Sequence, residues 1–239
     1  MALQSLTFDR ARFRVGSWRG DPHLAYLVPT SAADTLTARS IDAVTAALAS
    51  RGYGAVVTAA VGPHERDALR QEGFVDRETL HLLRHDLRGL AGSTGGSPRI
   101  RRGRRADRPA VLDLDAVTFD EFWHLDANGL QDAIEATPVS RLRVVRDPTV
   151  IGYAVAGRSG SQGFLQRLAV DPARQGSGIG RALVIDALRW MLRRRCSTAW
   201  VNTQQSNDRA LALYRRIGFV PADHQLTVLE RPLVARPEP

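Results

Sequence analysis

The stretch "VDPARQGSGIGRAL", residues 170–183, carries three glycines at alternate positions, Gly176, Gly178 and Gly180. Glycine has no Cβ atom, so its backbone can adopt positive φ angles and can approach a ligand closely. The loop leads into an expected helix at residues 180–195, and the unpaired N–H groups and dipole of a helix N-terminus attract anions. The spacing predicts either a pyrophosphate site between a strand and a helix or a tight turn that holds no ligand.

Two familiar nucleotide loops do not fit this stretch. A Walker loop ends in Gly-Lys-Ser/Thr, whereas Gly180 is followed here by Arg181 and Ala182, and the chain contains no lysine. The dinucleotide fingerprint needs its third glycine one position later and an acid at the end of the next strand, but "WVNTQQ", residues 200–205, has none. These departures exclude nucleotide hydrolysis of the Walker type and argue against a dinucleotide site.

Composition sets wider limits. The 239 residues suffice for one large or two small domains with a buried core, and a hydrophobic fraction of 44% is typical of globular proteins. All 33 basic residues are arginine, and the net charge of +8 suits an anionic ligand, an acidic partner or nucleic acid. The single cysteine, Cys196, cannot form an internal disulfide. Without a secretory pattern or an apolar run of roughly 18 to 20 residues, we expect a cytoplasmic protein with no membrane partner.

The hydrophobic pattern predicts an α/β chain with mixed strand directions. The expected strands cover residues 23–28, 54–61, 79–87, 99–105, 140–146, 149–159, 164–170, 198–204 and 226–233. The expected helices cover residues 34–51, 63–72, a stretch from residue 107, 180–195 and 207–217. The segment "LAGSTGGSP", residues 90–98, reads as a linker, which predicts domains at residues 1–89 and 99–239.

The two predicted domains contain an internal repeat. The aligned pairs are residues 41–52 with 185–196, 55–61 with 199–205, 67–75 with 212–220, and 79–87 with 225–233. Four elements in one order predict two related α/β halves. The glycine loop occurs only in the second half, since the first has "TSAADTLTAR", residues 30–39, in its place.

Two separated motifs give the second half a family resemblance. The string "LAVDPARQGSGIGRAL", residues 168–183, resembles motif A of the GNAT acyltransferase superfamily, Gln/Arg-x-x-Gly-x-Gly/Ala after a strand. The string "NDRALALYRRIGF", residues 207–219, resembles motif B of the same family. The resemblance covers residues 99–233. It implies a mixed, mostly antiparallel GNAT-type sheet flanked by helices, preceded here by a partial GNAT-like repeat.

The resemblance also implies a ligand and a reaction. The ligand is acetyl-CoA as co-substrate, and the reaction transfers its acetyl group to a primary amine of a small molecule or a peptide N-terminus by direct attack in a ternary complex. The pantetheine arm is expected along Leu168, Ala169 and Val170. The pyrophosphate is expected on the amides of Gln175, Gly176, Ser177, Gly178, Ile179, Gly180 and Arg181. Asn207 lies near the coenzyme in the family, although it could also be a helix cap.

Acyl transfer needs a proton for the departing thiolate and a neutral amine. Tyr214 matches the family tyrosine that protonates the coenzyme sulfur, and its alternative is an aromatic side chain packed on the sheet. Asn202 stands near the substrate, where many family members have a glutamate base, but an amide cannot take a proton. The base is unassigned, and the alternative function is a coenzyme A sensor or scaffold without turnover. By the repeat, Leu69 replaces Tyr214 and Gly62 replaces Asn207, so the first half is predicted to be degenerate.

The acceptor is the least defined partner. Residues 109–140 carry seven acids and no arginine, which suggests a cationic amine or peptide acceptor, or else only two solvated helix faces. The string "RIRRGRR", residues 99–105, could contact nucleic acid, but it falls on an expected strand and lacks interleaved aromatic residues. We therefore expect neither nucleic acid nor a metal ion at the site, and the oligomeric state is open.

Overall fold

The computed structural model describes residues 3–90 and 98–233, so most of the predicted linker at 90–98 lies outside the described residues. The chain forms two compact units. Of the described residues, the first contains 3–81, 204–206 and 223–233, and the second contains 82–90, 98–203 and 207–222. The sequence division places residues 223–239 with the second half, whereas the structure packs the described part, residues 223–233, in the first unit.

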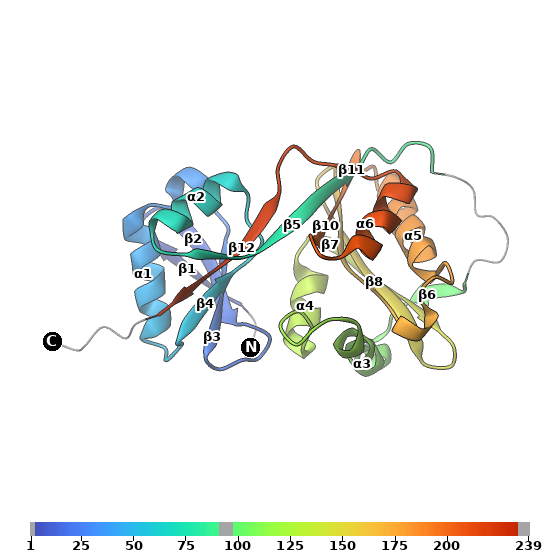
Figure 1. The fold of residues 1–239 in the computed structure, drawn as a ribbon, viewed down its shortest axis with the longest axis horizontal. Helices are drawn as coiled ribbons and strands as arrows, with labels where there is room; N and C mark the ends of the chain where they lie inside the picture. Colours follow the sequence, from blue (N-terminus) through green and yellow to red (C-terminus); the bar gives the residue numbers. More distant parts are fainter. Residues whose placement is uncertain (1–2, 91–97, 234–239) are drawn as a thin grey trace. The chain divides into compact units, whose positions relative to one another are not determined.

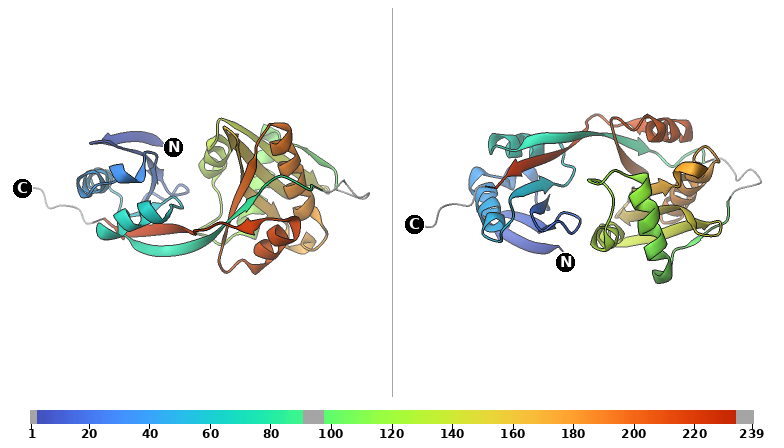
Figure 2. Two further views of the ribbon diagram at one scale, coloured as in Figure 1. Left: turned by 90° about the horizontal axis from the view of Figure 1, so that it is seen from above. Right: turned by 60° about the horizontal axis from the view of Figure 1, so that its bottom comes forward.

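The first unit is a sheet covered by two helices. Its strand order is β1 (Gln4–Phe8), β2 (Ala11–Ser17), β3 (Leu24–Pro29), β4 (Ala55–Thr58), β12 (Leu226–Pro232) and β5 (Val75–His85). Neighbours are antiparallel except β3 and β4, which are parallel and joined through α1 (Ala38–Ala49). Residues of α1 and α2 (Pro63–Gln71) share one buried cluster with the strands, and Figures 1 and 2 show both helices beside this sheet.

The β1–β2 hairpin was not predicted from the sequence. In β2, Ala11, Phe13 and Val15 are fully buried, whereas the arginines between them are not. This alternation is the period-2 signal of a strand with one face in the core. The arginines interrupt the apolar run, so only the alternation itself could have revealed the strand.

The second unit contains the mostly antiparallel sheet that the resemblance predicted. The strand order is β6 (Ile100–Arg102), β7 (Val139–Arg146), β8 (Val150–Ser159), β9 (Gln162–Val170), β10 (Thr198–Gln204) and then β5, which also pairs with β11 (Val220–Pro221). Its α-helices are α3 (Arg108–Thr118), α4 (Ala127–Glu135), α5 (Ile179–Arg193) and α6 (Asp208–Ile217). Strands β9 and β10 run parallel, because α5 crosses between them.

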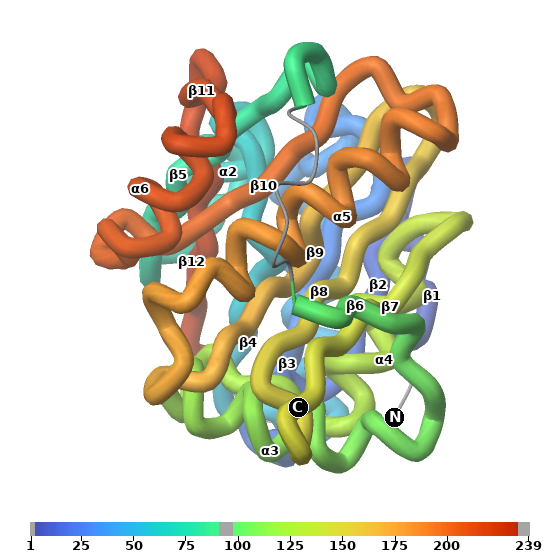
Figure 3. The backbone as a smooth tube through the Cα atoms, turned by 90° about the vertical axis from the view of Figure 1, so that its right-hand side faces the viewer, coloured from blue at the N-terminus to red at the C-terminus, as the bar shows by residue number. Residues whose placement is uncertain are grey.

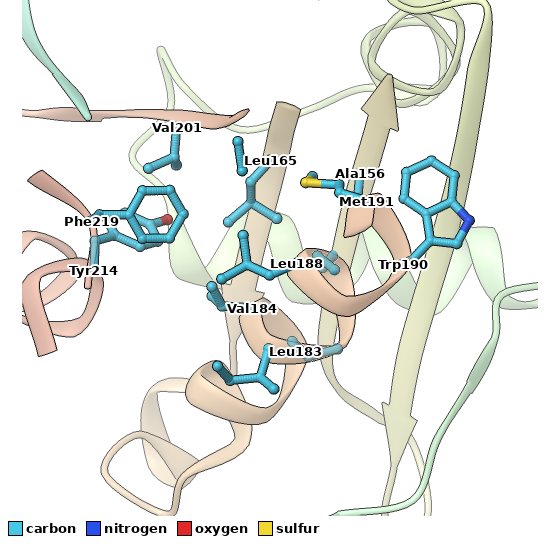
Figure 4. Packing of buried hydrophobic residues seen from close by; sticks show 14 of the residues in the cluster. Ala156, Leu165, Leu183, Val184, Leu188, Trp190, Met191, Val201, Tyr214 and Phe219 are labelled. Atoms are coloured by element: carbon cyan, nitrogen blue, oxygen red, sulfur yellow. The ribbon is translucent and has the colours of Figure 1, made fainter. Parts of the chain in front are cut away.

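Helices cover both faces of this second sheet. Along β8, Tyr153 and Val155 join the buried cluster of α3, whereas Ala154 and Ala156 join the cluster of α5. Strand side chains alternate between faces, so each face receives every second residue. Figure 3 shows α5 lying along β8 and β9, and Figure 4 shows Leu188 of α5 near Leu165 of β9. The crossover places the start of α5 beside the end of β9.

The internal repeat appears in the structure as matching elements. The series β3, α1, β4, α2 in the first unit corresponds to β9, α5, β10, α6 in the second. Gly73 and Gly218 follow α2 and α6 with φ angles of +81° and +110°, the left-handed conformation that commonly ends a helix. The strands that follow the two series in sequence do not stay with them. Strand β12 comes after the second series but lies between β4 and β5, and β5 comes after the first series but lies beside β10.

Candidate functional site

A gap opens in the second sheet where β9 and β10 separate. Within the described residues, their parallel pairing ends at Leu165 and Val201, although β9 continues to Val170 and β10 to Gln204. Gln166 is an extra residue in β9, because Val155 pairs with Arg167 and Ala156 with Leu165. Such a bulge bends a strand and increases its twist, which accounts for the separation just beyond Leu165.

The alternation of antiparallel hydrogen bonds shows which main-chain groups face this gap. Beyond the bulge, Val170 is opposite Gly152 of β8, and the next amide, Asp171 N, donates to Ile151 O at 3.0 Å. Hydrogen-bonded and non-hydrogen-bonded pairs alternate along such strands, so Ala169 uses its main-chain groups toward β8. Those of Leu168 and Val170 point toward the gap. Of the three predicted pantetheine contacts, Leu168 therefore offers both of its main-chain groups to the gap. Val170 offers its N–H, because its carbonyl accepts a hydrogen bond from Gln175 Nε2 at 3.2 Å.

The glycine loop forms a turn that ends at the N-terminus of α5. Gly176 and Gly178 have φ angles of +85° and +87°, in the left-handed region where other residues are strained, and no atom lies within 4 Å of a Cβ built on either one. Gly178 is the N-cap of α5 and supplies no capping side chain. The space beside Gly176 and Gly178 is therefore open.

Most predicted pyrophosphate contacts have unused amides. The N–H groups of Gly176, Gly178 and the first three residues of α5, Ile179–Arg181, have no acceptor among the described residues. By contrast, Ser177 N donates to Arg174 O at 3.4 Å, and Gln175 N lies 3.5 Å from Pro172 O. These five amides, in the loop and at the N-terminus of α5, are donors of the kind that bind anions in other proteins.

Helix α6 positions the predicted proton donor. Asn207 is its N-cap, and its Oδ1 accepts from Ala210 N at 3.0 Å. Tyr214, two turns later, is 5% exposed and packs against Phe219 with ring centroids 5.5 Å apart, as Figure 4 shows. Burial raises the pKa of Tyr214 above its ordinary value, so the phenol holds its proton. Both predicted readings of Tyr214 remain compatible with this packing, and the structure gives Asn207 a capping role.

Asn202 lies at the closed end of the gap. It directly follows Val201, the last β10 residue paired with β9, and its side chain is exposed. An amide there can donate or accept a hydrogen bond, but it cannot act as a base.

In its described residues, the first unit lacks the corresponding gap and open helix N-terminus. Thr58, which matches Asn202 in the repeat, still pairs with Leu27, and Ala59 N donates to Leu27 O at 2.8 Å. The Thr37 side chain caps α1 by accepting from Ser40 N, and the Ser40 side chain accepts from Thr37 N. Because side chains of the chain itself satisfy these amides, this helix start offers less to an anion.

A buried ion pair was missed by the sequence analysis. Asp115 on α3 has no exposed surface, and its carboxylate accepts two hydrogen bonds of 2.8 Å from Arg167 and one from the Tyr153 hydroxyl. It also accepts from Leu125 N at 2.5 Å, while Arg167 donates to Trp123 O at 2.7 Å. The network fixes the segment between α3 and α4.

The acidic segment at 109–140 is less available than its composition suggests. Besides the buried Asp115, Asp126 caps α4 by accepting from Gly129 N, and Asp120 accepts from Trp123 N. Asp113 and Glu121 are exposed. Part of this charge therefore serves folding, and the buried Asp115 fits neither the acceptor interpretation nor the alternative of solvated helix faces.

The basic string at 99–105 is also partly neutralised. Arg101 forms two hydrogen bonds with Asp107, at 2.6 and 2.8 Å, and Arg146 lies 3.4 Å from the same carboxylate. The hydrogen bonds from Arg101, partly opposed by burial, lower the pKa of Asp107 to about 2. The string supplies the short strand β6, as predicted.

Comparison with known proteins identifies the family. The model of the acetyltransferase (GNAT) family matches residues 108–219, which contain the gap, the glycine loop and α6. The N-alpha-acetyltransferase RimI of Mycobacterium tuberculosis is 39% identical over 122 residues, covering 48% of this chain and 73% of that protein. The chain belongs to the GNAT acetyltransferase family. As a GNAT protein it is an acyltransferase.

Other relatives extend the similarity of this GNAT chain to its first unit. A mycothiol acetyltransferase of Amycolatopsis mediterranei is 28% identical over 211 residues, covering 71% of this chain and 68% of that protein. A tandem GNAT protein from the clavulanic acid biosynthesis pathway has a similar fold, with a TM-score of 0.66 at 12% identity over 96% of this chain and 80% of that one. A GCN5-related N-acetyltransferase from Kribbella flavida also has a similar fold, with a TM-score of 0.68 at 13% identity over 97% of this chain and 90% of that one.

The described residues contain no helix that is both long and apolar enough to cross a membrane.

Proposed function

We propose that this GNAT enzyme transfers the acetyl group of acetyl-CoA to a primary amine by direct attack in a ternary complex. The observation that carries the proposal is the continuity of one site along β9, the loop and α5. The main-chain groups of Leu168 and Val170 that point away from β8 lead directly to the unused amides of Gly176, Gly178 and residues 179–181. The first set suits the amides of a pantetheine arm and the second suits a pyrophosphate.

Bound acetyl-CoA would supply the acetyl group as a thioester. The amine nitrogen attacks the carbonyl carbon, the C–S bond breaks, and Tyr214 donates its phenolic proton to the thiolate. Because burial raises the pKa of Tyr214, the neutral phenol persists until that donation. Asn202 is placed to hydrogen-bond the acceptor at the closed end of the gap. The group that removes the amine proton is unassigned.

We further propose that the first unit has lost its own coenzyme site, leaving one per chain. Its strands remain paired at Leu27 and Thr58, its helix α1 is capped by Thr37, and Leu69 occupies the position of Tyr214 in the repeat. Leu69 is fully buried and carries no proton to donate.

The acceptor proposed here is a small amine or a peptide N-terminus, with cationic amines favoured by exposed acids such as Asp113 and Glu121. The relatives named N-alpha-acetyltransferase and mycothiol acetyltransferase support including both acceptor types. The test is release of free thiol from acetyl-CoA against a panel of peptides, cationic amines and neutral amino sugars. Thiol release on at least one amine is expected. Coenzyme binding without thiol release on any acceptor would instead support a sensor or scaffold.

Replacing Gly178 by alanine should weaken coenzyme A binding by at least tenfold. A Cβ atom at φ +87° strains the turn, which costs about 1–2 kcal/mol, and relief of that strain would rotate the amides away from the anion. Calorimetric titration with coenzyme A measures the affinity. Gly160→Ala is the matched control, because Gly160 also has a positive φ of +56° with no atom within 4 Å of a built Cβ. An equal loss of affinity in both variants would contradict coenzyme A binding at the loop that contains Gly178.

A further inference from the structure

The side chain of Gln175 connects the edge of the gap to helix α6. Its Nε2 donates to Val170 O at 3.2 Å, and its Oε1 accepts a hydrogen bond from Nη1 of Arg209. The carbonyl of Val170 is one of the groups that face the gap. In the ligand-free chain, therefore, a side-chain amide of the protein occupies an acceptor that the proposed function gives to the pantetheine arm.

Helix α6 holds Arg209 over the loop. Leu213, one turn after Arg209 on the same helix face, packs toward the first turn of α5, where a Cβ built on Gly180 would lie 3.4 Å from Leu213 Cδ2. One face of α6 therefore covers both the loop at Gln175 and the N-terminus of α5. This packing brings the guanidinium of Arg209 to the side chain of Gln175, the residue that directly precedes Gly176 in the loop.

Arg209 has no carboxylate partner among the described residues. Its neighbour in the loop, Arg174, does pair with a carboxylate, that of Asp147, at 3.3 Å. A neutral amide oxygen is a weaker partner for a guanidinium than a phosphate oxygen, which accepts charge-assisted and often bidentate hydrogen bonds. Arg209 thus retains the capacity to bind an anion at the position where the amides converge.

We propose that Arg209 is a pyrophosphate-binding residue, held in place by Gln175 until the coenzyme arrives. The inference rests on the proposed function. In this proposal an amide of the pantetheine arm takes the place of Gln175 Nε2 at Val170 O, and coenzyme binding thereby releases Gln175. That release also frees the guanidinium of Arg209, which then pairs with the pyrophosphate. The exchange replaces one neutral partner of Arg209 by a charged one.

The experiment measures the dissociation constants of coenzyme A and 3′-dephospho-coenzyme A for Arg209→Gln and for the control Arg216→Gln, over a range of salt concentrations. Arg216 is an exposed arginine of the same helix, two turns further on. Arg209→Gln should weaken both ligands by the same factor, about tenfold at low salt, and should flatten the salt dependence. Arg216→Gln should change either constant by less than twofold, because exposed charges at a distance are screened.

Three results would overturn the inference. Equal dissociation constants for Arg209→Gln and the wild type would show that Arg209 does not bind the coenzyme. An equal loss in Arg216→Gln would show a general effect of net charge. If Arg209→Gln weakens the binding of coenzyme A but not that of 3′-dephospho-coenzyme A, Arg209 contacts the 3′-phosphate instead of the pyrophosphate. Failure of the proposed function is distinguishable, since the wild type would then bind neither ligand.

Discussion

Tyr214→Phe should lower kcat by about two orders of magnitude or more, the usual contribution of a positioned general acid, with little change in coenzyme A affinity. Phenylalanine keeps the packing against Phe219, and the lost hydroxyl has no hydrogen-bond partner among the described residues. The measurement is thiol release at saturating acetyl-CoA with the best amine of the panel. Fold stability should stay close to that of the wild type.

The pH dependence of the reaction rate provides a second test of Tyr214 as the acid. Burial raises the pKa of Tyr214, and the reaction needs its protonated form, so the rate should persist to a higher pH than an ordinary phenol allows. Tyr153→Phe is the control, because this buried hydroxyl donates to Asp115 and belongs to the packing of α3. It should lose stability rather than turnover. A Tyr214→Phe enzyme within threefold of the wild-type kcat would remove Tyr214 as the acid.

Arg167→Met should reduce the free energy of unfolding by about 3–5 kcal/mol, the usual cost of breaking a buried ion pair. The substitution leaves the carboxylate of Asp115 with no exposed surface and without its cation. Asp115→Leu in the same chain should restore much of the loss, because the unpaired charge is then gone. Denaturant titration of the single and double variants measures both effects.

Arg101→Met is the control for the loss of stability expected in Arg167→Met. Its partner Asp107 is nearly as buried as Asp115, but Arg101 itself is 35% exposed and Arg146 lies near the same carboxylate. Solvent and the second arginine should therefore limit its cost to well below that of Arg167→Met. If Arg167→Met costs less than Arg101→Met, the network around Asp115 does not hold α3 to the sheet.

Local features of this GNAT chain were predictable from the sequence. The apolar pattern gave β10 at residues 198–204 with the bounds that the structure has. The glycine spacing predicted a loop before a helix, and Gly176 and Gly178 have positive φ angles directly before α5. Both depend on residues close together in the chain, where spacing and conformational preference act directly.

Features that depend on distant residues were not predictable. The pattern of residues 226–233 suits a strand in either unit, so only the structure shows β12 between β4 and β5. The bulge at Gln166 has no signature in the sequence, although it opens the gap. Asp115 reads as one acid on a solvated helix, because its partner Arg167 is 52 residues away. The Gln175 and Arg209 contact likewise depends on how α6 packs.

The most direct test of the account is amide hydrogen exchange with and without coenzyme A. A single site between β9 and β10 should slow exchange at Leu168, Val170 and residues 176–181, while residues 27–40 of the first unit exchange as before. The account is contradicted if a sample that binds coenzyme A shows unchanged exchange at residues 176–181, or if the protection falls in residues 27–40 instead.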